Sequence, residues 1–160
     1  MQKTILFKIW KFPQLSETFV LNQVVTAIKL GFDVKILVGE CQDFKENSNL
    51  QIINKYNIRG RIIFEDYKIP KGKLWRMIKG FVLLLSFSVD WNSFKKFYRL
   101  SSKKDFSLIY KFNFYRKFKN VDIFHIQFGT NKHPVDILKK AGLLYGKVVV
   151  SFHGHDLYFP

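Results

Sequence analysis

The stretch TILFKIWKFPQLSETFVLNQVVTAIKLGFDVKILV, residues 4–38, carries the pattern that decides the fold. Residues 4–10 form a short apolar run rich in β-branched and aromatic side chains, which predicts a buried strand. Apolar residues then recur at helical spacing from Phe19 to Ile28, and Gly31 follows where a helix would end. Residues 32–38 predict a second strand. This order of strand, helix and strand predicts a βαβ unit with parallel strands.

The remaining chain continues this alternation without internal repeats or an obvious domain boundary. Further strands are predicted at residues 60–66, 121–128 and 146–152, and helices at residues 51–58, 73–87, 90–100, 101–119 and 133–144. We therefore expect one α/β domain over residues 1–160, with a Rossmann-like, doubly wound parallel sheet flanked by helices. Ligands bind such sheets at the carboxyl ends of the strands, where three polar stretches fall: FPQLSE, FGTNKH and HGHD, at residues 12–17, 128–133 and 153–156.

The composition is that of a globular protein. The chain has 160 residues, of which 48% are hydrophobic and 18% aromatic, enough to bury a core. Its single cysteine, Cys41, excludes an internal disulfide. The longest uninterrupted apolar run, residues 81–85, is far shorter than the roughly 20 residues of a membrane span, and no signal peptide is recognised. We expect a cytoplasmic location.

The formal net charge of +15 is the strongest compositional signal. It predicts attraction to nucleic acid, lipid headgroups or phosphorylated substrates, unless codon usage alone favours lysine. Lys73, Arg76 and Lys79 recur every third residue beside an apolar surface, which suits an anionic membrane as well as an ordinary solvated helix. Residues 95–119 add cations interleaved with Phe and Tyr, which could contact nucleic acid, although no known nucleic-acid-binding motif is present.

The first strand-to-helix loop contains no glycine, and neither GxGxxG nor GxxxxGK[ST] occurs. Dinucleotide binding of the Rossmann type is therefore disfavoured. Ser16 and Glu17 precede the first helix and can cap its N-terminus. The same helix end could instead receive a phosphate group, because its amide groups are free and its dipole is positive there.

The stretch HGHD offers His153, His155 and Asp156 as metal ligands, but no second cluster has metal-like spacing, so no metal is predicted. His153 could instead contact a substrate at the end of the last strand, with Gly154 allowing the backbone to turn, or it could be an ordinary hydrogen-bonded histidine. His125 lies inside an apolar strand, where a lone histidine is more often a core residue than a catalyst.

Three stretches together resemble a known family: FPQLSETFVLNQVVTAIKLGFDVKIL, VDIFHIQFG and VVVSFHGHDLY. They resemble the N-terminal part of the retaining glycosyltransferases of family 4, which have the GT-B fold, in the branch that builds exopolysaccharides such as colanic acid. The Ser-Glu-Thr-Phe run and the His-Gly-x-Asp turn carry the resemblance. It covers both ends of the chain well and residues 47–119 poorly.

The resemblance implies an enzyme that moves a sugar from a nucleotide-sugar donor to a lipid-linked or glycan acceptor, with retention of anomeric configuration. No cofactor or metal is implied, and the enzyme would work at the inner face of the cell membrane. By resemblance, His153 is the catalytic residue and approaches the donor sugar. The substrate-binding residues would be Ser16, Glu17, Thr18, His125 and Asp156.

Two departures from the family pattern are visible. Gln127 stands where family members often carry a second histidine, which puts the choice of acceptor in doubt. The chain also stops just after the His-Gly-x-Asp turn, so we expect a truncated N-terminal domain that lacks the donor-binding half, is inactive alone, and has a partner chain or missing C-terminal half. The alternative function is a non-catalytic basic α/β module that binds nucleic acid or an anionic surface.

Overall fold

The computed structural model describes residues 2–14, 18–42 and 49–154. The chain divides into two compact units. The first, which we call the sheet unit, comprises residues 1–65, 121–132 and 147–160. The second, the helical unit, comprises residues 66–120 and 133–146.

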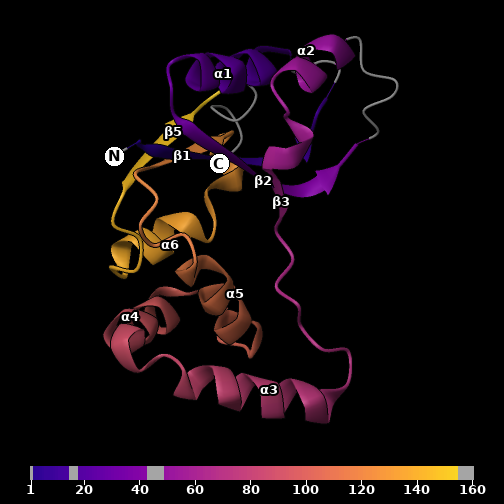
Figure 1. Ribbon diagram of the computed structural model, residues 1–160. Coiled ribbons are helices and arrows are strands. Elements are labelled where there is room, and N and C mark those ends of the chain that lie inside the picture. The colour runs from indigo at the N-terminus through magenta and orange to yellow at the C-terminus, as the bar shows by residue number, and fades with distance from the viewer. Residues whose placement is uncertain (1, 15–17, 43–48, 155–160) are drawn as a thin grey trace. The chain divides into compact units, whose positions relative to one another are not determined.

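Five parallel strands form one sheet in the order β3-β2-β1-β4-β5 (Figure 1). The strands are β1 (Thr4–Phe12), β2 (Asp33–Cys41), β3 (Ile62–Phe64), β4 (Ile123–Gln127) and β5 (Lys147–Ser151). This is the strand order of a Rossmann-like sheet, and it reverses direction between β1 and β4. The prediction of an α/β fold with a parallel sheet is confirmed.

The helices α1 (Thr18–Lys29) and α2 (Leu50–Lys55) pack against the sheet, with a 3-10 turn, η1 (Arg59–Arg61), before β3. Alternate residues of β1 and β2 face these helices, because successive strand side chains point to opposite sides of a sheet. The shared core contains Phe7, Ile9, Val24, Ile36 and Ile53. The turn after α1 is made by Gly31 at a φ of +82°, so the expected glycine terminator is confirmed.

Lys8 points to the other side of β1 and is buried. Its Nζ lies 3.3 Å from a carboxylate oxygen of Glu65, just after β3, and donates a hydrogen bond of 3.0 Å to the carbonyl oxygen of Asn131. Asn131 belongs to the 3-10 turn η3 (Gly129–Lys132) that follows β4. A buried charge needs such partners, and here they join three segments of the sheet unit.

The helical unit contains α3 (Lys73–Leu85), the 3-10 turn η2 (Ser88–Asp90), α4 (Trp91–Leu100), α5 (Ser107–Arg116) and α6 (Val135–Lys140). Its core is aromatic: the Phe112 ring lies 4.9–5.8 Å from the rings of Phe87, Phe94 and Phe97. The buried Asp90 accepts a hydrogen bond of 2.8 Å from Arg116 Nε. This contact ties the start of α4 to the end of α5.

The positions of the predicted elements hold, but several bounds differ. β3 has three residues where seven were expected, because residues 59–61 form η1. The helix expected over residues 101–119 is confined to Ser107–Arg116. In the part of the chain that the structure describes, no helix is both long enough and apolar enough to span a bilayer. The single domain over residues 1–160 stays a prediction.

Candidate functional site

A cluster of polar side chains lies in the sheet unit where β4 and β5 end, beside α1. Residues two apart in a strand share a face, which places His125 and Gln127 of β4 on the same side. Ser151 ends β5, and His153 follows two residues later. The cluster lies next to the position between β1 and β4 where the order of the strands reverses. Sheets of this kind bind ligands at that position.

Gln127 lies at the centre of this cluster and is fully buried. Its Nε2 donates a hydrogen bond of 2.7 Å to Gln23 Oε1 of α1, and its Oε1 lies 2.9 Å from His153 Nε2. An amide oxygen can only accept, so His153 Nε2 carries the proton and donates. The buried amide thus joins α1 to the segment after β5.

His153 is held by rings as well as by this hydrogen bond. The ring centroids of Phe19 and Phe128 lie 4.5 Å and 4.6 Å from that of His153. Gly154 follows with a φ of +77°, a conformation that glycine adopts without steric strain, so the predicted turn is confirmed. The imidazole is half-buried and has a fixed orientation at the edge of the sheet.

His125 is a hydrogen-bonded, half-buried histidine. Its Nε2 lies 2.7 Å from Ser151 Oγ, and its ring centroid lies 5.0 Å from that of Phe7. Burial lowers the pKa of His125 below its ordinary value of 6.5, and the nearby His153 lowers that pKa further. A neutral His125 can accept the proton of the Ser151 hydroxyl at Nε2 or donate its own proton to the hydroxyl oxygen, depending on the tautomer. This site therefore holds a neutral imidazole at pH 7.

A cavity of about 470 Å³ lies along α1 next to His125. Its walls are mainly apolar and include Phe7 and Phe19, whereas Asn22 and Gln23 contribute polar groups. A mostly apolar cavity with a few polar groups is a common form of ligand site.

The structure brings together two of the predicted site residues, His125 and His153, which both contact Gln127, and His125 also contacts Ser151. Thr18 is the first residue of α1 and is exposed. The other three predicted substrate-binding residues, Ser16, Glu17 and Asp156, lie outside the described residues, as does His155. Among the residues that are described, no group of three or more His, Cys, Asp or Glu could hold a metal ion.

Sequence reasoning missed the part played by Gln23 and Ser151, and it treated Gln127 only as a departure from a family pattern. A signal was present for Gln23, because it lies four residues after Phe19 on the side of α1 that faces the cluster. A polar residue in that position needs a polar partner on the sheet. For Ser151 the strand pattern gave no such signal.

No protein family model matches the chain, and no solved structure matches it. Two curated proteins are similar to it over 94% of its length. They are the amylovoran biosynthesis glycosyltransferase AmsK of Erwinia amylovora, at 30% identity, and WcaL of Escherichia coli (strain K12), provisionally named a colanic acid biosynthesis glycosyltransferase, at 28% identity. The chain spans 37% of the length of each relative. It is thus similar, along nearly all of its residues, to two glycosyltransferases of exopolysaccharide biosynthesis.

Proposed function

We propose that residues 1–160 form the acceptor-side part of a glycosyltransferase of surface polysaccharide synthesis. The enzyme moves a sugar from a nucleotide-sugar donor to a lipid-linked or glycan acceptor at the inner face of the cell membrane. The similarity to AmsK and WcaL over 94% of the chain carries this proposal. The motif resemblance supports the finer assignment to retaining family 4 and the GT-B fold.

In this proposal His153 is the catalytic residue that contacts the donor sugar. Transfer breaks the bond between the sugar and the diphosphate. Because His153 donates its Nε2 proton to Gln127, we assign it a positioning contact, in which the fixed imidazole orients the donor sugar while this bond breaks. The orientation of the imidazole by Gln127, Phe19 and Phe128 supports this role, since a polar group must be fixed to act in one direction.

The remaining roles follow the resemblance residue by residue. Ser16, Glu17 and Thr18 line the cleft at the start of α1, Asp156 shapes the turn after β5, and His125 contributes to substrate binding. No metal or cofactor is part of the proposal. By resemblance, residues beyond the stretch shared with AmsK and WcaL hold the nucleotide. The 160 residues alone are therefore expected to release little or no nucleoside diphosphate from sugar donors.

The proposal is tested in source cells from which the gene has been deleted. We expect mass spectrometry of their lipid-linked glycans to show an intermediate that lacks one sugar and all later ones. The native gene should restore the complete glycan, whereas His153→Ala should reduce transfer about 100-fold, the scale expected when a group that positions the reacting sugar is lost.

The matched control is His133→Ala. His133 is exposed and pairs with Asp136 at 2.8 Å within the helical unit, so its loss should leave transfer unchanged. Unaltered glycans in the deletion strain would contradict the proposal. Restoration by His153→Ala as complete as by the native gene would remove His153 from the mechanism.

A further inference from the structure

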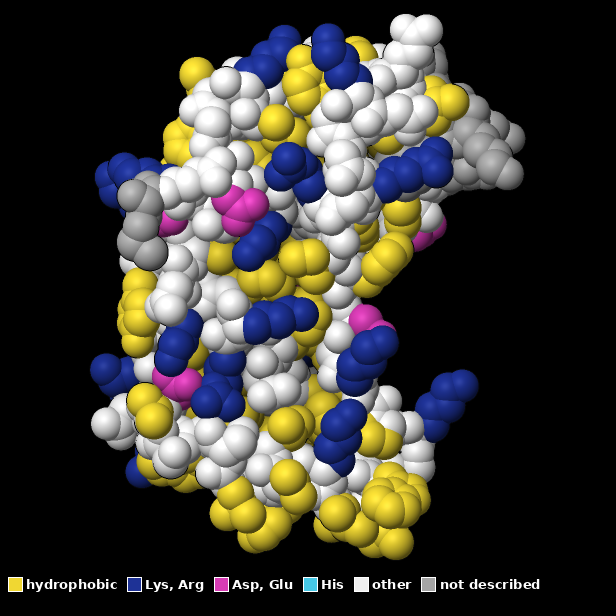
Figure 2. All heavy atoms as spheres, in the orientation of Figure 1, with side chains coloured by type: hydrophobic (Ala, Val, Ile, Leu, Met, Phe, Trp, Pro, Cys, Tyr) yellow, Lys and Arg dark blue, Asp and Glu magenta, His cyan; other side chains and the backbone are white. Residues whose placement is uncertain are grey.

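One side of α3 is an uninterrupted row of exposed apolar side chains. Figure 2 shows hydrophobic side chains gathered over α3, with Lys and Arg along the border. Spacings of three and four residues place such side chains on one side of a helix. We call this set the α3 face. Its members, each at least 47% exposed, are Leu74, Trp75, Met77, Ile78, Phe81, Val82 and Leu85.

The opposite side of α3 is the one that packs within the helical unit. Gly80 is buried so closely against Phe106 that an added Cβ would lie 3.0 Å from its ring. The hydroxyl of Tyr110 donates a hydrogen bond of 2.6 Å to the carbonyl oxygen of Arg76. These contacts orient α3 on α5 and turn the α3 face outward. Exposed apolar surfaces of this extent mark interaction sites.

The positive charge of the chain is concentrated in the segment of sequence that contains this helix. Residues 66–120 hold 14 of the 27 Lys and Arg but only three of the 12 Asp and Glu. Each of these three carboxylates is engaged: Asp66 with Lys68, Asp90 with Arg116, and Asp105 with Ser107. The rest of the chain has 13 basic against nine acidic residues, so a uniform bias towards lysine does not account for the distribution.

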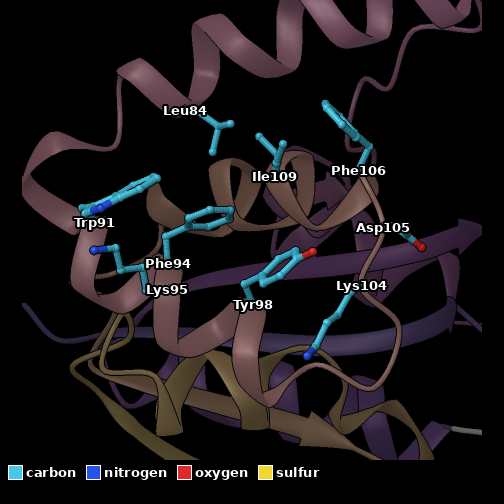
Figure 3. A pocket seen from close by; sticks show the side chains of 9 residues that line it. All are labelled: Leu84, Trp91, Phe94, Lys95, Tyr98, Lys104, Asp105, Phe106 and Ile109. Atoms are coloured by element: carbon cyan, nitrogen blue, oxygen red, sulfur yellow. The ribbon is translucent and has the colours of Figure 1, made fainter.

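The helical unit also holds an apolar cavity of about 490 Å³, which lies between α3, α4 and α5 (Figure 3). Leu84 contributes from α3, Phe94 and Tyr98 from α4, and Ile109 from α5, while Phe106 directly precedes α5. The cavity is also lined by two cationic side chains, Lys95 and Lys104, and by one carboxylate, Asp105, which accepts a hydrogen bond from the backbone N–H of Ser107. Apolar walls beside lysines suit a hydrocarbon chain that carries an anionic headgroup.

We propose that the α3 face is a docking surface for an anionic lipid bilayer, with α3 lying in the plane of the headgroups. Helices with one apolar side and flanking Lys and Arg bind membranes in this way. Charge decides between the occupants. A second copy would bring two strongly positive units together, and nucleic acid would leave the apolar residues without a partner. The inference extends the proposed membrane location, but it rests on α3 and not on sugar transfer.

The test measures binding of the chain to lipid vesicles of phosphatidylcholine alone and of phosphatidylcholine with phosphatidylglycerol. We expect binding to the second kind, weakened by salt. Two equally exposed leucines make a matched pair. Leu85→Gln should weaken binding about tenfold, because a leucine no longer enters the bilayer, whereas Leu30→Gln in the sheet unit should not. The triple variant Leu74→Gln, Phe81→Gln and Leu85→Gln should abolish vesicle binding. The single variants Lys95→Gln and Lys104→Gln, which each remove one positive charge, should each weaken vesicle binding about fivefold.

Tryptophan fluorescence gives a second readout. Here membrane binding produces a spectral change, so the result does not rely on a loss of binding that unfolding of a variant could also cause. With Trp10 and Trp91 changed to Phe, Trp75 is the only tryptophan, and its emission should shift to the blue when anionic vesicles are added. Absence of vesicle binding, or equal binding by Leu85→Gln and Leu30→Gln, would overturn the proposal. The proposal would also be overturned by a dimer that the triple variant converts to monomers, or by oligonucleotide binding without vesicle binding. Vesicle binding by a protein that transfers no sugar would uphold this inference while the proposed function failed.

Discussion

The sheet unit and the helical unit differ in how much apolar surface their central elements expose to solvent. In the sheet unit alternate apolar residues of β1 and β2, among them Phe7 and Ile36, are buried in a core shared with α1 and α2. The polar cluster of His125, Gln127 and His153 lies at the strand ends. In the helical unit an aromatic core is buried, yet the α3 face is exposed and surrounded by cations. The two proposals together assign chemistry to the sheet unit and membrane attachment to the helical unit.

The largest effect is expected from two phenylalanines of the helical unit. Phe112 is fully buried among three other rings, so Phe112→Ala should lower the free energy of unfolding by about 4 kcal/mol. Phe81 is 63% exposed on α3, and Phe81→Ala should change this free energy by less than about 0.5 kcal/mol. Denaturant titration followed by circular dichroism measures both. Equal destabilisation would show that the α3 face is part of the core, which would break the comparison.

The buried ion pair of the sheet unit comes next. The side chains of Lys8 and Glu65 are 7% and 6% exposed, so Lys8→Met leaves a buried carboxylate without this cation and should cost about 3 kcal/mol of stability. The double variant Lys8→Met with Glu65→Leu should recover part of that loss, because both charges are gone. Fully additive losses in the same titration would show that the two side chains are not coupled.

Gln127 tests the polar cluster itself. Gln127→Leu removes the acceptor that orients His153 and should lower sugar transfer about tenfold in complemented cells, without affecting vesicle binding. Gln127→His, which restores the residue that family members often carry there, should retain more activity than Gln127→Leu. If both variants transfer sugar as well as the native protein, the orientation of His153 by Gln127 has no part in the reaction.

The smallest effect concerns pH. Because the pKa of His125 is lowered in the folded state, the unfolded chain binds the proton more readily as the pH falls below about 6.5. Stability is therefore lost from there down towards the lower folded-state pKa. His125→Gln should reduce this loss in thermal melts recorded below about pH 6.5. A pH dependence unchanged by the substitution would contradict a buried, neutral His125.

The apolar periodicity of the sequence predicted the helices and strands of the sheet unit well, because the apolar sides of these elements pack against one another. β1 and β2 begin at or within one residue of the predicted positions, with Gly31 as the break before β2, but they end two and three residues later than predicted, at Phe12 and Cys41. β3 was overestimated, because a local apolar run does not reveal that residues 59–61 close into a 3-10 turn.

Tertiary contacts were the part that local patterns could not supply. The sequence placed Asp90 near a helix start, but its carboxylate makes no capping bond and instead accepts from Arg116, 26 residues away. In the same way, Gln23 and Gln127 are separated by 104 residues and meet only because α1 packs beside β4. The helix at residues 73–85 was predicted from its period, but which side faces outward depends on Gly80 and Tyr110.

The most direct measurement compares His153→Ala with the triple α3 variant in the deletion strain, scoring both sugar transfer and the fraction of protein bound to membranes. The account predicts that His153→Ala remains on the membrane and transfers about 100-fold less sugar, whereas the α3 variant leaves the membrane with its His153 cluster intact. Full transfer by His153→Ala would contradict the assignment of chemistry to the sheet unit.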